Sequence, residues 1–307
     1  SNTADRLNVS EGDFILIRVN QSSPIPVNAP FAAETSTVAL RLKVKAVLSA
    51  AKMGRFSLQS IQTAPFNIFV SGDKLAGKLG LENRVNTVLL SGGDVDLSGV
   101  QQEFSENWQL TDAGLNIQQL NDEVIELTTD RIFIDPPVMD AVKNLGLPNQ
   151  RILTYLVNDI GHNNTHTPYS FVSAAIPPVV PENLKNNETI INQWLAEDLG
   201  VQQGDTLTFT YFVIGPLRRL EETSRKFVVR DVIPVQDYLS GSSLMPDFPG
   251  LADAGSCSEW NSSVPINLDR IRDKDETYWD DYRGTPKALI NISAGTEMWG
   301  NEFGKYT

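Results

Sequence analysis

The chain has 307 residues, of which 41% are hydrophobic and 21% are charged, a composition typical of a globular protein with one large or two moderate domains. Its formal net charge of -13 at pH 7 disfavours nucleic acid or an anionic membrane surface as partners, because the electrostatic contribution to binding would be repulsive. No apolar run approaches the roughly 18 residues that predict a membrane-spanning helix, and the single cysteine, Cys257, cannot form an internal disulfide.

The first 130 residues are predicted to contain both strands and helices. Ser1 and Asn2 are interpreted as the remnant of an expression tag. Alternating apolar and polar residues predict strands over 14–19 and 37–48. A strand–helix–strand unit follows, with strands over 67–70 and 86–91 and a helix over 73–79, then a helix over 99–108 and short strands over 115–117 and 124–127.

The central part of the chain is predicted to be rich in strands. A helix is expected between Asp135 and Gly146, because two prolines follow the aspartate and glycine suits a helix end. The segments RILTYLVNDI, 151–160, and YSFVSAAI, 169–176, predict strands on either side of the polar loop GHNNTHTP. The stretch 175–188 is rich in Pro and Asn, so it is the best candidate for a linker or hinge.

The next predicted elements surround a short turn. A helix over 192–199 is followed by a turn at Gly204 and Asp205, which leads into a strand over 206–214. The segment KFVVRDVIPV, 226–235, predicts a partner strand. The Gly-Asp pair is explained by the backbone freedom that a turn needs rather than by ligand binding.

The only two histidines, His162 and His166, are four residues apart, and Asp159 lies close to them in the sequence. On a helix this spacing would place both imidazoles on one face, as a metal site requires. The surrounding Asn, Thr and Pro residues favour a solvated loop, so the three side chains are weak candidates for a structural metal site.

No catalytic motif is recognised, and no cofactor is predicted. The sequence has no GxSxG nucleophile elbow, P-loop, Rossmann glycine pattern or HExxH motif. Cys257 lies in GSCSEW with no histidine nearby in the sequence, although a spatial approach of His162 would supply the base that a nucleophile needs.

A dense group of charges and aromatic rings occupies DRIRDKDETYWDDYRGTPKALI, residues 269–290. Its carboxylates are candidates for an acid and base pair, as in glycoside hydrolysis. Every carboxylate has a Lys or Arg within a few residues, however, which favours a packed, charge-paired corner over a catalytic cleft. The candidate structural or coupling residues are Asp275, Glu276, Tyr278, Trp279, Tyr282 and Arg283, together with Gly204 and Asp205. Tyr278, Trp279 and Tyr282 are expected to give one helical turn an aromatic face that docks on the core.

Several segments, in order from about residue 37 to residue 307, carry a resemblance to a known family. They are TVALRLKVKAVL, MGRFSLQSIQTAPFNIFV, RVNTVLLSG, TYLVNDI, TPYSFVSA, INQWLAEDLGVQQGDTLTFTYF, LMPDFPGLADA, RIRDKDETYWDDYRGTPKALI and GTEMWGNEFGKYT. Together they resemble the extracytoplasmic domain of FtsX-like ABC transporter permeases, the group with MacB-like periplasmic core domains. The segments LAEDLGVQQGDTLTF and RIRDKDETYWDDYRGTPKA are the most specific.

The resemblance implies an α+β fold with two subdomains, one with strand–helix–strand units and one a mixed, β-rich subdomain. Residues 1–130 together with 260–307 are expected to form the part near the membrane stems, and 131–259 an inserted distal part. Membrane helices of the permease would precede residue 1 and follow Thr307. We also expect segment 270–286 to pack against the N-terminal strands and hold the two ends together.

The function that the resemblance implies is not catalysis by this domain. In such permeases the domain lies on the periplasmic side of the bacterial inner membrane and couples helix motion, driven by a cytoplasmic ATPase, to a substrate or partner. The partners would be that ATPase and either a periplasmic protein or a lipid or lipoprotein substrate. Two alternatives remain open: a free-standing periplasmic ligand-binding protein and an envelope hydrolase that uses the acidic cluster.

Overall fold

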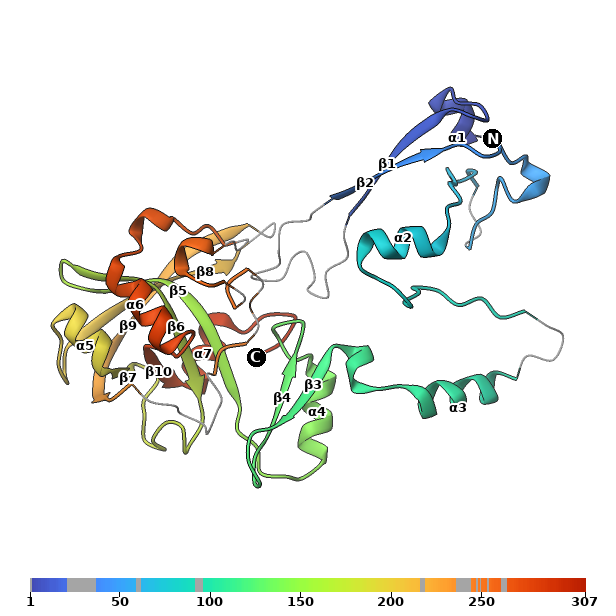
Figure 1. Ribbon diagram of the computed structural model, residues 1–307. Helices are drawn as coiled ribbons and strands as arrows, with labels where there is room; N and C mark the ends of the chain where they lie inside the picture. The colour runs from blue at the N-terminus through green and yellow to red at the C-terminus, as the bar shows by residue number, and fades with distance from the viewer. Residues whose placement is uncertain are drawn as a thin grey trace. The chain divides into compact units, whose positions relative to one another are not determined.

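The computed structural model describes residues 2–20, 37–58, 62–91, 96–215, 219–235, 244–246, 248, 250–252, 254–260 and 264–307. Within these ranges, none of the helices has the length and apolar character needed to cross a membrane. The chain forms two compact units, Ser1–Ser22 with Thr35–Phe104 and Ser23–Glu34 with Ser105–Thr307. The fold mixes helices and strands, as predicted, and is of the α+β type (Figure 1).

The first unit contains a two-stranded antiparallel sheet and short helices. Strand β1 (Phe14–Asn20) pairs with β2 (Thr37–Lys43), and Phe14 lies opposite Lys43. Alternate residues of both strands are partly or fully buried, which confirms the period-two pattern of the sequence. The helices are α1 (Asn2–Leu7), the 3-10 turn η1 (Ala50–Lys52), α2 (Gly72–Leu79) and α3 (Leu97–Asn107), the last of which crosses the boundary between the units.

The strand–helix–strand prediction for the first unit is wrong in its strands. Helix α2 is present, but 67–70 and 86–91 form no strand, and β2 ends at Lys43 instead of extending to residue 48. In these two segments the side chains of Phe69 and Leu89 are more than half exposed. A β-rich sequence becomes a strand only when a neighbouring strand accepts its backbone hydrogen bonds, and these segments have no such ladder.

The second unit opens with a hairpin and a helix. The 3-10 turn η2 (Leu110–Ala113) leads to β3 (Leu115–Gln119), which pairs antiparallel with β4 (Ile125–Thr129); both strands were predicted, but their pairing was not. Helix α4 (Pro136–Asn144) begins after Asp135 with proline in its first turn, and Gly146 has a φ of 67° just after its end. Both signals for this helix are therefore confirmed.

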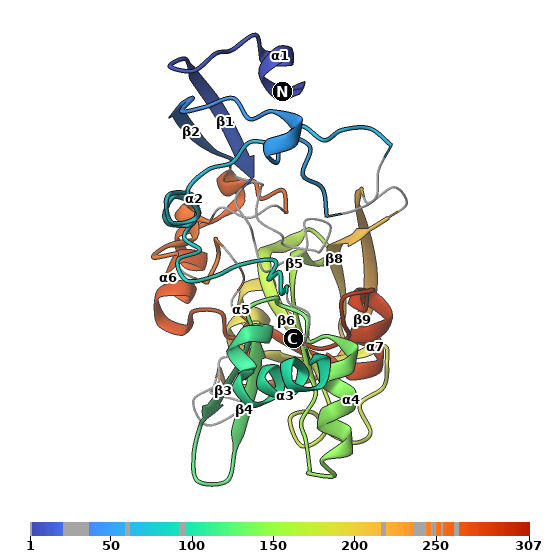
Figure 2. The ribbon, with the colours of Figure 1, turned by 90° about the vertical axis from the view of Figure 1, so that its right-hand side faces the viewer.

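Six strands form a closed barrel in the order β10-β6-β5-β8-β9-β7 (Figures 1 and 2). They are β5 (Ile152–His162), β6 (Thr165–Ala175), β7 (Glu188–Asn192), β8 (Thr206–Ile214), β9 (Leu220–Ile233) and β10 (Ala288–Asn291). The pairs β10–β6 and β7–β9 are parallel, and the other four are antiparallel. Closure leaves no free edge and encloses a core in which Phe209 and Phe227 are fully buried.

The predicted loop GHNNTHTP is instead mostly strand. Strand β5 continues to His162 and β6 begins at Thr165, so only two residues form the turn, and Asn163 has a φ of 52°. A two-residue hairpin turn requires positive φ, which asparagine tolerates. The predicted linker 175–188 connects β6 to β7 inside the same unit rather than joining two domains.

Two helices cover the barrel. Asn192 is the N-cap of helix α5 (Gln193–Leu199), and its side chain accepts a hydrogen bond from the Leu195 N–H group at 2.9 Å. Helix α7 (Ile292–Trp299) follows β10 directly and packs on β6 and β5. The segment 260–307 thus belongs to the barrel unit, because β10 closes the barrel between β6 and β7, and this division of the chain differs from the predicted one.

Replacing Gly295 of α7 with alanine is expected to destabilise the barrel unit by about 1–3 kcal/mol. A Cβ atom at this position would lie 2.2 Å from the Cβ atom of Ala174, a fully buried residue of β6. Urea unfolding measures the loss, with Ser293→Ala, at an exposed position of the same helix, as the control. A Gly295→Ala variant as stable as the unmodified protein would contradict this close helix–strand contact.

Candidate functional site

The candidate site is built around helix α6 (Asp273–Tyr282), which contains most of the residues singled out in the sequence. Arg272 is its N-cap, and the Asp275 carboxylate accepts a hydrogen bond from the Arg272 backbone N–H group at 3.0 Å. Three acidic residues in the first turn lie near the positive end of the helix dipole, which favours them there. The local sequence thus explains both where the helix starts and why it is so acidic.

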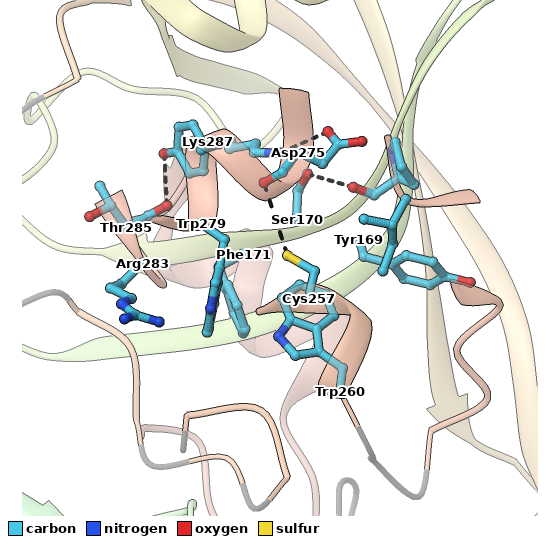
Figure 3. Close-up of a pocket in the computed structure, with 13 residues that line it drawn as sticks. Tyr169, Ser170, Phe171, Cys257, Trp260, Asp275, Trp279, Arg283, Thr285 and Lys287 are labelled. Carbon is cyan, nitrogen blue, oxygen red and sulfur yellow. Dashed lines mark hydrogen bonds and ion pairs between the residues drawn. The ribbon is translucent and has the colours of Figure 1, made fainter. Parts of the chain in front are cut away.

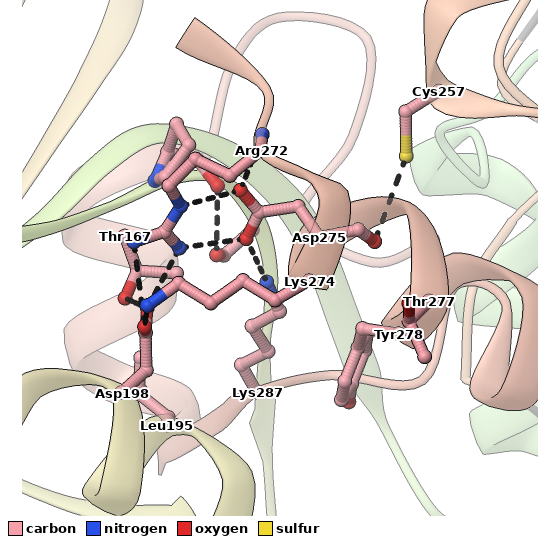
Figure 4. Close-up of polar contacts among 12 residues, drawn as sticks. Thr167, Leu195, Asp198, Cys257, Arg272, Lys274, Asp275, Thr277, Tyr278 and Lys287 are labelled. Carbon is pink, nitrogen blue, oxygen red and sulfur yellow. Dashed lines mark hydrogen bonds and ion pairs between the residues drawn. The ribbon is translucent and has the colours of Figure 1, made fainter.

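Arg272 joins two carboxylates from different parts of the chain (Figure 4). Its Nε and Nη2 atoms each lie 2.7 Å from an oxygen of Asp275, and Nη2 also lies 2.7 Å from Asp198 on α5. Asp198 additionally pairs with Lys274 and accepts a hydrogen bond at 2.5 Å from the hydroxyl of Thr167 on β6. These contacts fasten α6 to α5 and to the barrel wall.

The ion pairs shift the pKa values of both partners toward their charged forms. Burial alone would raise the pKa of Asp198, but hydrogen bonds from Lys274, Thr167 and Arg272 outweigh it and lower that pKa. Burial would likewise lower the pKa of Arg272, but the hydrogen bonds and charges of Asp275 and Asp198 outweigh it and raise that pKa. Both groups are therefore charged at neutral pH.

Lys287, which directly precedes β10, completes the cluster. Its side chain is 5% exposed, and its Nζ lies 3.8 Å from Asp275, 4.1 Å from the ring centre of Trp194 and 4.7 Å from that of Tyr278. Burial lowers the pKa of Lys287 from 10.5 to about 8, although the charges of Asp275 and Asp198 oppose that change. The α6 charge cluster, defined as Asp198, Arg272, Lys274, Asp275 and Lys287, thus holds three basic side chains against two carboxylates.

The aromatic residues of α6 divide between the core and the surface. Tyr278 and Trp279 are buried, whereas Tyr282 is 40% exposed and contacts the ring of Tyr278. The Tyr278 hydroxyl donates to the Thr285 carbonyl and accepts from the side chain of Asn192, both at 2.9 Å. The expected docking face therefore consists of Tyr278 and Trp279.

Glu276 and Arg283 attach α6 to the segment 254–260. The Glu276 carboxylate accepts hydrogen bonds from the backbone N–H groups of Cys257 at 2.8 Å and Ser258 at 2.9 Å. Arg283 donates to the carbonyl groups of Ala254 and Gly255, each at 3.2 Å. Both side chains therefore fix the backbone of this segment against α6.

Cys257 lines a small, partly open cavity beside this segment, together with Trp260, Trp279, Asp275 and Lys287 (Figure 3). Burial, followed by the nearby charge of Glu276, raises the pKa of its thiol to about 12, so the thiol is protonated at neutral pH. The cavity has a volume of about 20 Å³, enough for one water molecule. It has no room for an organic substrate.

The histidine group is only partly assembled. His166 Nδ1 lies 2.8 Å from Asp159, whereas His162 Nδ1 lies 3.0 Å from the Thr206 carbonyl oxygen. Among the residues that the structure describes, no group of three or more His, Cys, Asp or Glu side chains is arranged to hold a metal ion. Asp159 is instead shared between His166 and Arg270.

The Gly-Asp turn lies apart from the α6 charge cluster and connects strands. Gly204 has a φ of 95°, and its N–H group donates to the Val229 carbonyl on β9 at 2.8 Å. The Asp205 carboxylate accepts from the Gln202 N–H group at 2.8 Å. These contacts set the start of β8 against β9, which matches the prediction of a turn.

Sequence reasoning missed Asp198, Lys287, Asn192 and Trp194. Asp198 lies beside buried Leu199 on the short helix α5, and Lys287 directly precedes the buried residues of β10. A lone charge next to an apolar run, as at Lys287, is a signal for a buried ion pair, whereas Asp198 directly follows Glu197, and the sequence names the partner of neither. The contacts that fix segment 270–286 lie within the barrel unit, and its predicted contact with the N-terminal strands stays a prediction.

No protein-family model matches the sequence, and no curated protein matches it detectably.

Proposed function

We propose that the chain is a non-catalytic periplasmic domain of an FtsX-like, MacB-like ABC transporter permease. In this proposal a cytoplasmic ATPase drives the membrane helices, and the domain couples their motion to a substrate or partner in the envelope. The α+β fold with a β-rich unit is compatible with such a domain. The order and extent of the resembling sequence segments supply the functional class.

The observation that carries the proposal is the attachment of Thr307 to the barrel. Its N–H group donates to the Ile152 carbonyl at 2.9 Å, and its hydroxyl accepts from the Thr154 N–H group at 3.0 Å. Both partners belong to β5, a central strand of the barrel. If a membrane helix follows this position, as the resemblance implies, its displacement acts directly on the barrel wall.

The charge cluster supports a mechanical role over a chemical one. Asp275 and Glu276 are the best acid candidates in the sequence, and each is occupied by several hydrogen bonds that hold α6 in place. A hydrolase would need a carboxylate that reaches a substrate. A rigidly attached helix next to the barrel suits a domain that transmits force.

The test is to sequence the gene on both sides of this region and to express the full gene with any adjacent ATPase gene. We expect apolar segments of about 20 residues close to both ends, and co-purification of the ATPase with the full protein in detergent. A signal peptide immediately before the region and a stop codon directly after Thr307 would refute the permease assignment.

A further inference from the structure

A second, larger cavity lies in the barrel unit and shares Tyr169 with the first one. Its volume is about 390 Å³, within the range of small-molecule sites. The residues that matter for its chemistry are Asn158, Tyr169, Phe212, Glu222, Ile266 and Arg270. They come from strands β5, β6, β8 and β9 and from the segment that ends in the 3-10 turn η5 (Leu268–Arg270).

The cavity forms where β8 departs from β5. These strands pair only from Asp159 opposite Thr210 to Gly161 opposite Thr208, whereas β8 continues along β9 to Ile214. The pairing of β5 with β6 is also interrupted at Asn158 of β5 and Tyr169 of β6. Tyr169 has a φ of 37°. The irregular ladder leaves a cleft between strands that are otherwise closely packed.

Asn158 is a buried polar group that lacks a complete set of partners. It is 3% exposed, and its Nδ2 atom donates to Glu222 at 2.8 Å. Its Oδ1 atom has no hydrogen-bond partner in the described part of the protein. The carboxylate fixes the orientation of the amide, because a flipped amide would place Oδ1 against another acceptor.

The charges around the cavity are unbalanced. Arg270 is paired with Asp159, and its guanidinium lies over the ring of Tyr169 at 5.6 Å. Among the described residues Glu222 forms no ion pair; it is exposed, and its carboxylate accepts a hydrogen bond from the neutral amide of Asn158. Within the described residues, the cavity therefore presents a carboxylate that no cation pairs with and an amide oxygen that no donor reaches, beside Arg270, which is already paired with Asp159.

We propose that this cavity binds an alkylammonium group. The ammonium would donate to the Glu222 carboxylate and supply the donor that the Asn158 amide lacks, while Phe212 and Ile266 contact the alkyl chain. Peptide amino termini and lysine side chains both provide this chemistry. The inference does not depend on the proposed permease function.

Calorimetric titration at pH 7 and low salt tests the proposal with three probes. Leucinamide carries an α-ammonium, Nα-acetyl-lysine methylamide carries a side-chain ammonium, and acetyl-leucinamide carries neither. We expect at least one ammonium probe to bind, acetyl-leucinamide not to bind, and Glu222→Gln to weaken binding about tenfold or more. Glu221→Gln is the matched control, because adjacent residues of a strand point to opposite faces.

The two ammonium probes distinguish the natural sources of the ligand. Binding of leucinamide alone identifies a peptide amino terminus, and binding of the lysine derivative alone identifies a lysine side chain. Absence of binding by both, equal binding to the Glu222→Gln variant, or equal binding of acetyl-leucinamide would each overturn the proposal. Circular dichroism of both variants verifies that the exposed substitutions leave the fold intact.

Discussion

Replacing Asp275 with alanine is expected to lower the free energy of unfolding by about 3–5 kcal/mol. The carboxylate is 6% exposed, receives two hydrogen bonds from the Arg272 guanidinium and lies 3.8 Å from Lys287 Nζ. Without this carboxylate, the charges of Arg272 and Lys287 lose a negatively charged partner. The replacement also removes the capping contact at the start of α6. Urea unfolding followed by circular dichroism measures the change.

The matched control for this prediction is Asp280→Ala on the same helix. Asp280 is exposed, so its replacement is expected to change stability by at most about 0.5 kcal/mol. An Asp275→Ala variant as stable as the control would contradict the structural role of the charge cluster. The envelope hydrolase interpretation predicts instead that the variant stays stable and loses a turnover.

Local signals in the sequence predicted several elements correctly because their causes are local. Asp135 followed by two prolines predicted the start of α4, and the turn at Gly204 and Asp205 predicted the start of β8. Each of these signals is a backbone requirement that a few neighbouring residues meet by themselves. Predictions from such signals therefore do not depend on contacts with the rest of the fold.

The barrel itself depends on contacts between distant segments. Strand β10 pairs with β6, and Ala288 lies opposite Val172, more than a hundred positions earlier in the chain. Periodicity indicates that a segment is a strand but does not name its neighbour. The same limit explains the error at 67–70 and 86–91, where strand-like residues have no ladder in the structure.

The candidate site shows the same division between local and distant information. The charge pairing within 272–275 was expected, and the structure contains it as the Arg272–Asp275 ion pair. The partner Asp198 comes from α5 and Lys287 from the position just before β10, and the closed barrel brings both to α6. Sequence reasoning therefore identified the helix but not what the helix is attached to.

Lys287→Met is expected to abolish a pH dependence of stability between about pH 8 and pH 10.5. Burial lowers the pKa of Lys287 from 10.5 to about 8, so in this window the unfolded chain binds more protons than the folded protein. The stability contributed by this site therefore rises with pH, by roughly 3 kcal/mol over the window. Below pH 8 both states are protonated, and the contribution is constant.

The measurement is the free energy of unfolding in urea at pH 7 to 10.5, followed by circular dichroism. The unmodified protein should gain stability relative to Lys287→Met as the pH rises, and the difference should be flat below pH 8. Lys274→Met is the control, because that lysine belongs to the same cluster but its side chain is 50% exposed. Parallel curves for the unmodified protein and Lys287→Met would show that the ammonium is not held in a desolvated site.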